Sequence, residues 1–216
     1  MQFYNLGNFM RIITFTLALL MSLTIQAKQI AETADQVTPL LNGQQVPSVL
    51  TTTANNKQVD LLSVLDNKKT ILFFYRGGWC PFCNTQMGQL KAIEGELSQL
   101  GFQLIGISTD SVDDLNASIK DKKLPYQLLS DYNSAVSQAF GLAFFSSQKV
   151  TDRYLEKMKL TNPLQKNQAG EKRLVLPAPA VYVIDDKGLV QFNYVNANYK
   201  VRLDEQLLLL AAKLVK

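Results

Sequence analysis

Two cysteines, Cys80 and Cys83, are the side chains of this sequence best suited to covalent chemistry. The 216-residue chain contains no histidine and no other cysteine. Mechanisms that need an imidazole are therefore excluded, among them Ser-His and Cys-His nucleophile pairs and histidine-based zinc catalysis. The chemistry that remains is that of a dithiol, which can attack an oxidant and close to a disulfide.

The spacing of the two cysteines gives each a role. Residues three apart lie on the same side of a helix, so both sulfurs can join in one turn. Cys80 would stand at the open N-terminal edge of the helix, where unpaired N–H groups and the positive end of the dipole favour a thiolate. We therefore expect Cys80 to be the nucleophile and Cys83 to resolve it.

Three neighbours of the dithiol are expected to support it. Pro81 fits the first position of a helix, where a missing N–H costs nothing. Trp79 would wall the site with apolar surface, and Arg76 offers a cation at the end of the preceding strand.

Other uses of two cysteines are weaker. A structural disulfide between them would close too short a loop to stabilise the fold much. A structural zinc ion needs four ligands. With two cysteines and no histidine per chain, two molecules would have to share one ion. A copper(I) site with Met87 as a third ligand is chemically possible, but Met87 lies on an apolar helical stripe and is better explained by packing. We expect no metal and no cofactor.

The elements around the dithiol are a strand and a helix. Residues 70–75 form a continuous apolar, β-favouring run, which predicts a buried central strand. From Pro81 to Gly101 apolar residues recur at spacings of three and four, which predicts a helix with one buried face. The dithiol is thus expected at the junction between them.

The rest of the chain alternates between strand and helix patterns. Strands are expected at 46–51, 57–60, 102–107, 126–129, 180–184 and 189–194, and helices at 61–65, 112–120, 133–140 and 203–215. This alternation predicts an α/β fold with parallel strands, and the turn residues at 185–188 predict a terminal hairpin. Residues 28–216 are expected to form one domain.

A long interruption separates the helix at 133–140 from that hairpin. Residues 144–176 contain an expected short helix at 151–160 and an excess of basic residues. A connection of this length is a functional flap or a flexible insert. We interpret its charges as a solvated helix surface in preference to a docking site.

The first 27 residues have the pattern of a signal peptide. Arg11 precedes the apolar run 12–25, and polar sequence begins at Lys28, so cleavage is expected after Ala27. The run is shorter than the roughly 20 residues of a membrane span, and no second long apolar run follows. We expect a periplasmic or secreted protein with no stable membrane span after cleavage; the alternative is an inner-membrane anchor. A net charge of +4 is too small to indicate nucleic-acid binding.

Several segments together resemble a known family. The run FYRGGWCPFCN, with VPSVL before it and LIGISTDS, LPYQLLSD and PAPAVYVIDDKG after it, is similar to the peroxiredoxin-like (AhpC/TSA) branch of the thioredoxin superfamily. The resemblance implies a thioredoxin-like fold with a peroxiredoxin-type N-terminal extension and a central mixed sheet flanked by helices. It places Cys80 where peroxiredoxins carry the peroxide-attacking cysteine, and Pro179 where thioredoxins carry a cis proline facing the disulfide.

The sequence differs from both peroxiredoxins and thioredoxins at positions that matter for their chemistry. Peroxiredoxins carry Thr or Ser three residues before the reactive cysteine and an Arg near the opposite strand, where this chain has Gly77 and the pair Pro179, Ala180. Thioredoxins carry a buried acid six residues before the nucleophile, where this chain has Phe74.

The resemblance therefore predicts reduction of hydroperoxides through Cys80 and Cys83, with an external dithiol as reductant. The first alternative is thioredoxin-like exchange with protein disulfides. The second is a non-catalytic redox sensor or copper(I) carrier.

Overall fold

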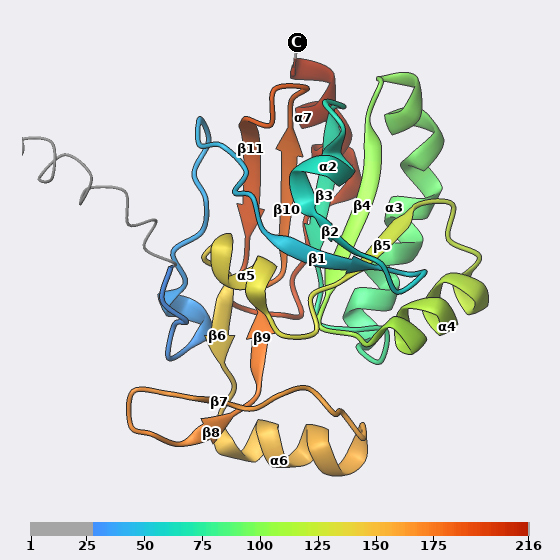
Figure 1. The fold of residues 1–216 in the computed structure, drawn as a ribbon. Helices are drawn as coiled ribbons and strands as arrows, with labels where there is room; N and C mark the ends of the chain where they lie inside the picture. The colour runs from blue at the N-terminus through green and yellow to red at the C-terminus, as the bar shows by residue number, and fades with distance from the viewer. Residues whose placement is uncertain (1–27, 216) are drawn as a thin grey trace, which may run out of the picture.

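The computed structural model describes residues 28–215. The expected signal peptide, residues 1–27, lies outside this range. The described residues form a central sheet with helices on both faces (Figure 1). Among them, no helix has the length and apolar character needed to cross a membrane.

The central sheet has seven strands in the order β11-β10-β3-β4-β5-β1-β2. Strands β3, β4 and β5 pair in parallel, and the other neighbours are antiparallel. The predicted mixed sheet is therefore confirmed. The strands are β1 (Leu50–Thr53), β2 (Gln58–Asp60), β3 (Thr70–Phe74), β4 (Gln103–Ser108), β5 (Gln127–Ser130), β10 (Ala180–Ile184) and β11 (Val190–Val195).

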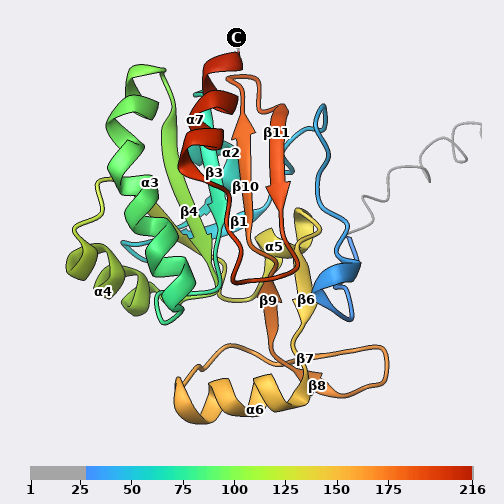
Figure 2. The same ribbon diagram turned by 180° about the vertical axis from the view of Figure 1, so that it is seen from behind.

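Helices cover the two faces of the sheet unequally. The long helix α3 and the terminal helix α7 lie together on one face, and the short helices α2 and α5 lie on the other (Figures 1 and 2). The helices outside the insertion are η1 (Ala34–Gln36, a 3-10 turn), α2 (Leu61–Leu65), α3 (Pro81–Gln99), α4 (Val112–Lys122), α5 (Ala135–Ala139) and α7 (Glu205–Leu214).

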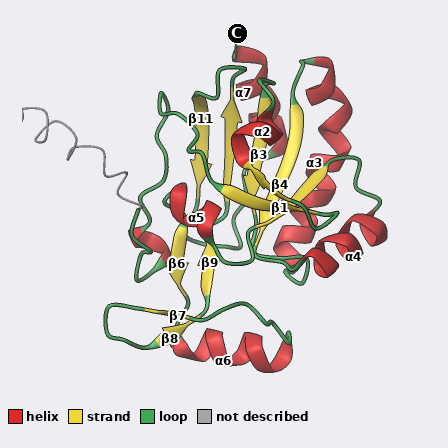
Figure 3. Ribbon diagram, in the orientation of Figure 1, coloured by secondary structure: helices red, strands yellow, loops and turns green. Residues whose placement is uncertain are grey.

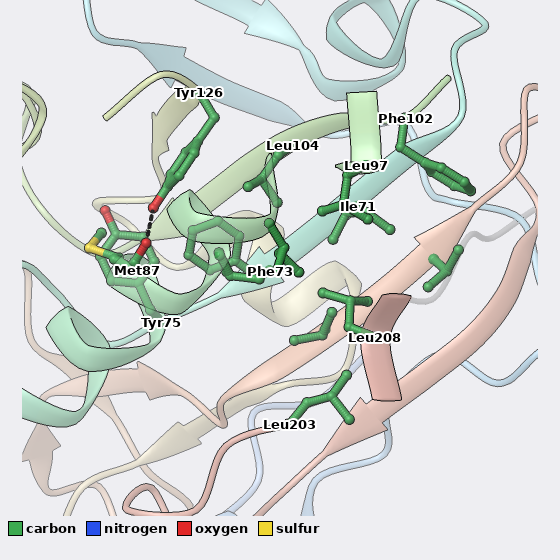
Figure 4. Packing of buried hydrophobic residues seen from close by; sticks show 14 of the residues in the cluster. Ile71, Phe73, Tyr75, Met87, Leu97, Phe102, Leu104, Tyr126, Leu203 and Leu208 are labelled. Atoms are coloured by element: carbon green, nitrogen blue, oxygen red, sulfur yellow. Dashed lines mark hydrogen bonds between the residues drawn. The ribbon is translucent and has the colours of Figure 1, made fainter. Parts of the chain in front are cut away.

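Strand β3 divides the hydrophobic core into two layers. Its side chains alternate, so Ile71 and Phe73 pack with α3 and α7, whereas Leu72 and Phe74 pack on the opposite face. Figure 4 shows the first layer, in which the Tyr126 hydroxyl donates a hydrogen bond of 3.0 Å to the backbone oxygen of Met87. Burial on both faces explains why the whole strand is apolar and why it holds the start of α3 rigidly.

The interruption at residues 144–176 folds as a projecting arm. Strands β6 (Ala143–Phe145) and β9 (Val175–Pro177) form an antiparallel ribbon that leads away from the main sheet (Figures 1 and 3). The far end carries helix α6 (Gln148–Lys157) and the small hairpin of β7 (Gln165–Lys166) and β8 (Lys172–Arg173). We call residues 143–177 the arm.

Some predicted boundaries are wrong by a few residues. Helix α6 begins before the predicted start at residue 151 because the Ser147 hydroxyl accepts a hydrogen bond from the N–H of Val150 and caps the helix. Helix α5 begins after the predicted start at residue 133. Ser134 adopts a left-handed backbone conformation, which cannot be part of a right-handed helix.

Candidate active site

The dithiol lies where β3 gives way to α3, as the sequence predicts. Cys80 is the N-cap residue of α3 and Pro81 is its first residue. The N–H of Cys80 donates to the carbonyl of Gly77 at 3.1 Å, and the side-chain amide of Asn84 donates to the carbonyl of Gly78 at 3.0 Å. These bonds fasten the loop before Cys80 to the first turn of the helix.

Both cysteines are free thiols and both are buried. Cys80 is 1% exposed and Cys83 is 0% exposed. The ionisation of the two thiols is linked, because each one shifts the pKa of the other. An oxidant therefore has to reach a closed site before it meets either sulfur.

Arg202 favours negative charge on the sulfur of Cys83. The hydrogen bond to Cys83, followed by burial, raises the pKa of Cys80 well above that of a free thiol, although Arg76 opposes this. Burial alone would raise the pKa of Cys83, but hydrogen bonds from Cys80 and Arg202 and the charge of Arg202 lower it to about 6. The lowering of the Cys80 pKa expected from the helix N-terminus is opposed here by Cys83 and by burial.

Arg202 is the cation that contacts sulfur. Its Nη2 donates to Cys83 Sγ at 3.3 Å, and its Nη1 donates to the backbone oxygens of Val201, at 3.1 Å, and of Tyr199. It belongs to the segment between β11 and α7, far from the dithiol in sequence. Sequence reasoning missed it, because no spacing rule connects this segment to the cysteines.

Arg76 contacts aromatic rings instead of sulfur. Its guanidinium lies 4.3 Å from the ring centre of Tyr199, 5.2 Å from that of Tyr154 and 5.7 Å from that of Trp79. Its Nη2 also donates to the Tyr154 hydroxyl at 3.0 Å. A buried cation is tolerated here because ring faces and a hydroxyl replace water around it.

Asp110 supports the loop from the neighbouring strand. It follows β4, and its Oδ2 accepts hydrogen bonds from the N–H of Gly78 at 2.8 Å and from the Ser108 hydroxyl at 3.0 Å. Burial raises the pKa of Asp110 to about 6, although these two hydrogen bonds oppose the rise. The acid stands in the segment LIGISTDS, which carried the family resemblance without revealing this contact.

Comparison with known proteins identifies the family. Residues 42–193 match the AhpC/TSA family, which is most of the chain. The chain belongs to the AhpC/TSA family. The predicted resemblance is therefore confirmed.

Relatives within the AhpC/TSA family include bacterial peroxiredoxins. A putative peroxiredoxin Bcp of Haemophilus influenzae is 36% identical over 106 residues, and peroxiredoxin Bcp of Escherichia coli is 29% identical over 104 residues. Each match covers 48% of this chain and 66% of the relative. The chain thus matches just under two thirds of the length of these relatives.

Solved structures agree with the fold. Reduced Prx3 of Vibrio vulnificus, in complex with hydrogen peroxide, superposes with a TM-score of 0.64 at 16% identity, over 80% of this chain and 99% of that one. Peroxidoxin BcpB of Mycobacterium tuberculosis gives a TM-score of 0.60 at 18% identity, over 81% and 97% of the two chains. These likenesses confirm the predicted thioredoxin-like fold of peroxiredoxin type.

Two positions that the AhpC/TSA resemblance singled out have clear structural settings. A Cβ on Gly77 would lie 2.2 Å from Trp79 Nε1 and 2.6 Å from Asp110 Oδ1, so the indole occupies the space of a side chain there. Pro179 directly precedes Ala180, which pairs with Phe74 at the end of β3 and so brings Pro179 beside the strand that leads to the dithiol. No peptide bond in residues 28–215 is cis, so Pro179 differs from the thioredoxin pattern.

The third sulfur considered for copper is not part of the site. Met87 is 0% exposed and belongs to the core layer between α3 and β3 (Figure 4). The sequence placed it on the packed stripe of the helix, and the structure confirms that placement.

Proposed function

We propose that this AhpC/TSA family member is a thiol-dependent peroxidase in which Cys80 attacks a hydroperoxide and Cys83 resolves the product. The observation that carries the proposal is the pair of buried cysteines at the start of α3, with Arg202 donating a hydrogen bond to Cys83 Sγ. The family and its peroxiredoxin relatives support peroxide as the oxidant.

The first step is attack by Cys80. It gives up its proton to solvent, and its sulfur attacks the terminal oxygen of the hydroperoxide. The O–O bond breaks, Cys80 becomes a sulfenic acid, and the alkoxide leaves as an alcohol with a proton from solvent.

The second step closes the disulfide. Cys83, whose thiolate form Arg202 favours, then attacks the sulfur of the Cys80 sulfenic acid. Hydroxide leaves as water after taking up a proton, and the Cys80–Cys83 disulfide forms. An external dithiol then donates two electrons and two protons, through a mixed disulfide, to restore both thiols.

A single-turnover reaction tests this function. The reduced protein is mixed with stoichiometric hydrogen peroxide and quenched for mass analysis at successive times. We expect fast conversion to the disulfide, a trapped sulfenic acid in Cys83→Ser, and no sulfenic acid in Cys80→Ser. Reaction no faster than that of free cysteine would reject the peroxidase.

Thiol-disulfide exchange is the second candidate function. It is favoured by Gly77, which offers no hydroxyl to organise a peroxide, and by the Cys-X-X-Cys pair in one helical turn. A slow peroxide reaction together with rapid reduction of a peptide disulfide, trapped as a mixed disulfide on Cys80 in the Cys83→Ser variant, would establish this function instead.

Export is the remaining part of the proposal. It rests on the sequence pattern of residues 1–27 alone. Expression of the full chain in a Gram-negative bacterium, followed by fractionation and N-terminal mass analysis, tests it. A periplasmic product that begins at Lys28 would support cleavage, and an uncut product in the membrane fraction would support the anchored alternative.

A further inference from the structure

Aromatic rings cover the arginine beside the dithiol. Cys80 and Cys83 are almost without solvent contact, and Arg76, whose charge acts on Cys80, is only 4% exposed. Arg76 is in turn covered by the rings of Tyr154 and Tyr199. The rings of Tyr154 and Tyr199 therefore lie on the side of the dithiol that Arg76 occupies.

Tyr154 is the part of this cover that the arm supplies. It lies on α6, its ring packs edge-on against Trp79 with centres 4.8 Å apart, and its hydroxyl accepts the hydrogen bond from Arg76. Its neighbours Arg153 and Lys157 are exposed, whereas Tyr154 is half-buried against Arg76 and Trp79.

In addition to the contacts of Tyr154, the arm is attached near the site by Asn162. The side-chain amide of Asn162, which follows α6, donates to the backbone oxygen of Thr109 at 2.7 Å and to that of Tyr132 at 3.0 Å. Thr109 itself donates to the backbone oxygen of Arg76 at 3.1 Å. The position of Tyr154 is therefore tied to the same loop that carries the dithiol.

We propose that Tyr154 determines the size of the molecule that reaches the dithiol, so that small hydroperoxides enter and bulky ones are excluded. The inference rests on the proposed peroxidase function and narrows its substrate class. A hydroperoxide the size of hydrogen peroxide needs only a small opening beside the ring. A bulky organic hydroperoxide needs the ring displaced, which breaks the contacts with Arg76 and Trp79.

Size selection can be measured without peroxide. The reduced protein is treated with iodoacetamide and, separately, with a fluorescein-bearing iodoacetamide, which share one reactive group and differ in bulk. We expect Tyr154→Ala to raise the ratio of bulky to small alkylation rates by about tenfold, the scale on which pocket size discriminates. Tyr154→Phe keeps the ring and should keep the ratio of the wild-type protein.

Arg153→Ala is the matched control. Arg153 is exposed beside Tyr154 on the same turn of α6, so its replacement should leave both alkylation rates unchanged. An unchanged ratio in Tyr154→Ala would overturn the inference. So would an equal rise in Tyr154→Phe or in Arg153→Ala, because neither variant removes the ring.

The same variants are then compared with hydrogen peroxide and cumene hydroperoxide in single turnover. The inference expects the cumene-to-hydrogen peroxide rate ratio to rise in Tyr154→Ala by a similar factor. If neither peroxide reacts faster than with free cysteine, the peroxidase proposal fails, while the alkylation ratio still decides whether Tyr154 controls access.

Discussion

Arg202 donates a hydrogen bond to the sulfur of Cys83, with 3.3 Å between Nη2 and Sγ. The two residues are 119 positions apart in the sequence, one just before the terminal helix and one in the first turn of α3. The contact places a fixed positive charge against the inner sulfur and helps to explain why the pKa of Cys83 falls although burial acts to raise it.

Replacing Arg202 should therefore raise the pKa of Cys83. In a Cys80→Ser background only Cys83 titrates, and Arg202→Gln removes the cation and its charge-assisted bond while keeping an amide donor. Since the charge favours the thiolate, the pH of half-maximal iodoacetamide reaction should move upward by about one unit or more. Ultraviolet absorbance of the thiolate gives an independent measurement.

Arg202→Lys is the control for this titration because it keeps the charge. Its Cys83 pKa should lie below that of Arg202→Gln. Equal titration curves in the Gln variant and its parent would show that Arg202 is a packing residue with no electrostatic effect on the sulfur.

The local part of the site could be predicted from sequence and the long-range part could not. The buried strand, the helix beginning at Pro81 and the cysteines at their junction follow from period and composition within one stretch of chain. Arg202 lies at the site because the segment before α7 packs there. Tyr154 lies at the site because the arm places α6 next to the loop before Cys80. Their sequence neighbourhoods are polar and carry no motif.

The electrostatics of the dithiol also depend on a residue that is distant in sequence. A helix N-terminus favours a thiolate at Cys80, and that argument holds for an isolated cysteine. Here Cys83 lies one turn in, next to Arg202, which favours a thiolate at Cys83 as well. The outcome depends on a cation that no local pattern reveals.

Restoring the usual peroxiredoxin hydroxyl at position 77 should not improve this site. In Gly77→Thr the new Cβ would fall within 2.2 Å of Trp79 Nε1, so the indole has to move and the loop before Cys80 shifts with it. We expect a loss of about 1–3 kcal/mol in the free energy of unfolding and no gain in the rate of peroxide reaction. Urea unfolding and single-turnover kinetics measure the two effects.

Gly88→Ala on α3 is the matched control for that substitution. No atom lies within 4 Å of its added Cβ, and alanine favours a helix, so stability should rise by up to about 1 kcal/mol. A faster peroxide reaction in Gly77→Thr at undiminished stability would contradict the steric argument and show that the indole yields its place readily.

Asp131 should stabilise the fold by an amount that depends on pH. Its Oδ1 accepts from the N–H of Val136 at 2.7 Å, and its Oδ2 accepts from the N–H of Ser137 at 2.8 Å, which together fasten the start of α5. Asp131→Ala leaves these buried donors unpaired and should lower the free energy of unfolding by about 2 kcal/mol.

The sign of the pH effect follows from burial. Burial raises the pKa of Asp131 from 3.8 to about 6, although hydrogen bonds from Ser137, Val136 and Ala135 oppose the rise. The folded state binds the Asp131 proton more tightly than the unfolded state does. The stabilisation that results from this proton binding is fully present below pH 3.8 and is lost as pH rises through about 6. The difference between the wild-type protein and Asp131→Ala should therefore be larger near pH 4.5 than near pH 7. Urea unfolding of both proteins at the two pH values measures it, and a larger difference at the higher pH would mean that the folded state favours the ionised carboxylate.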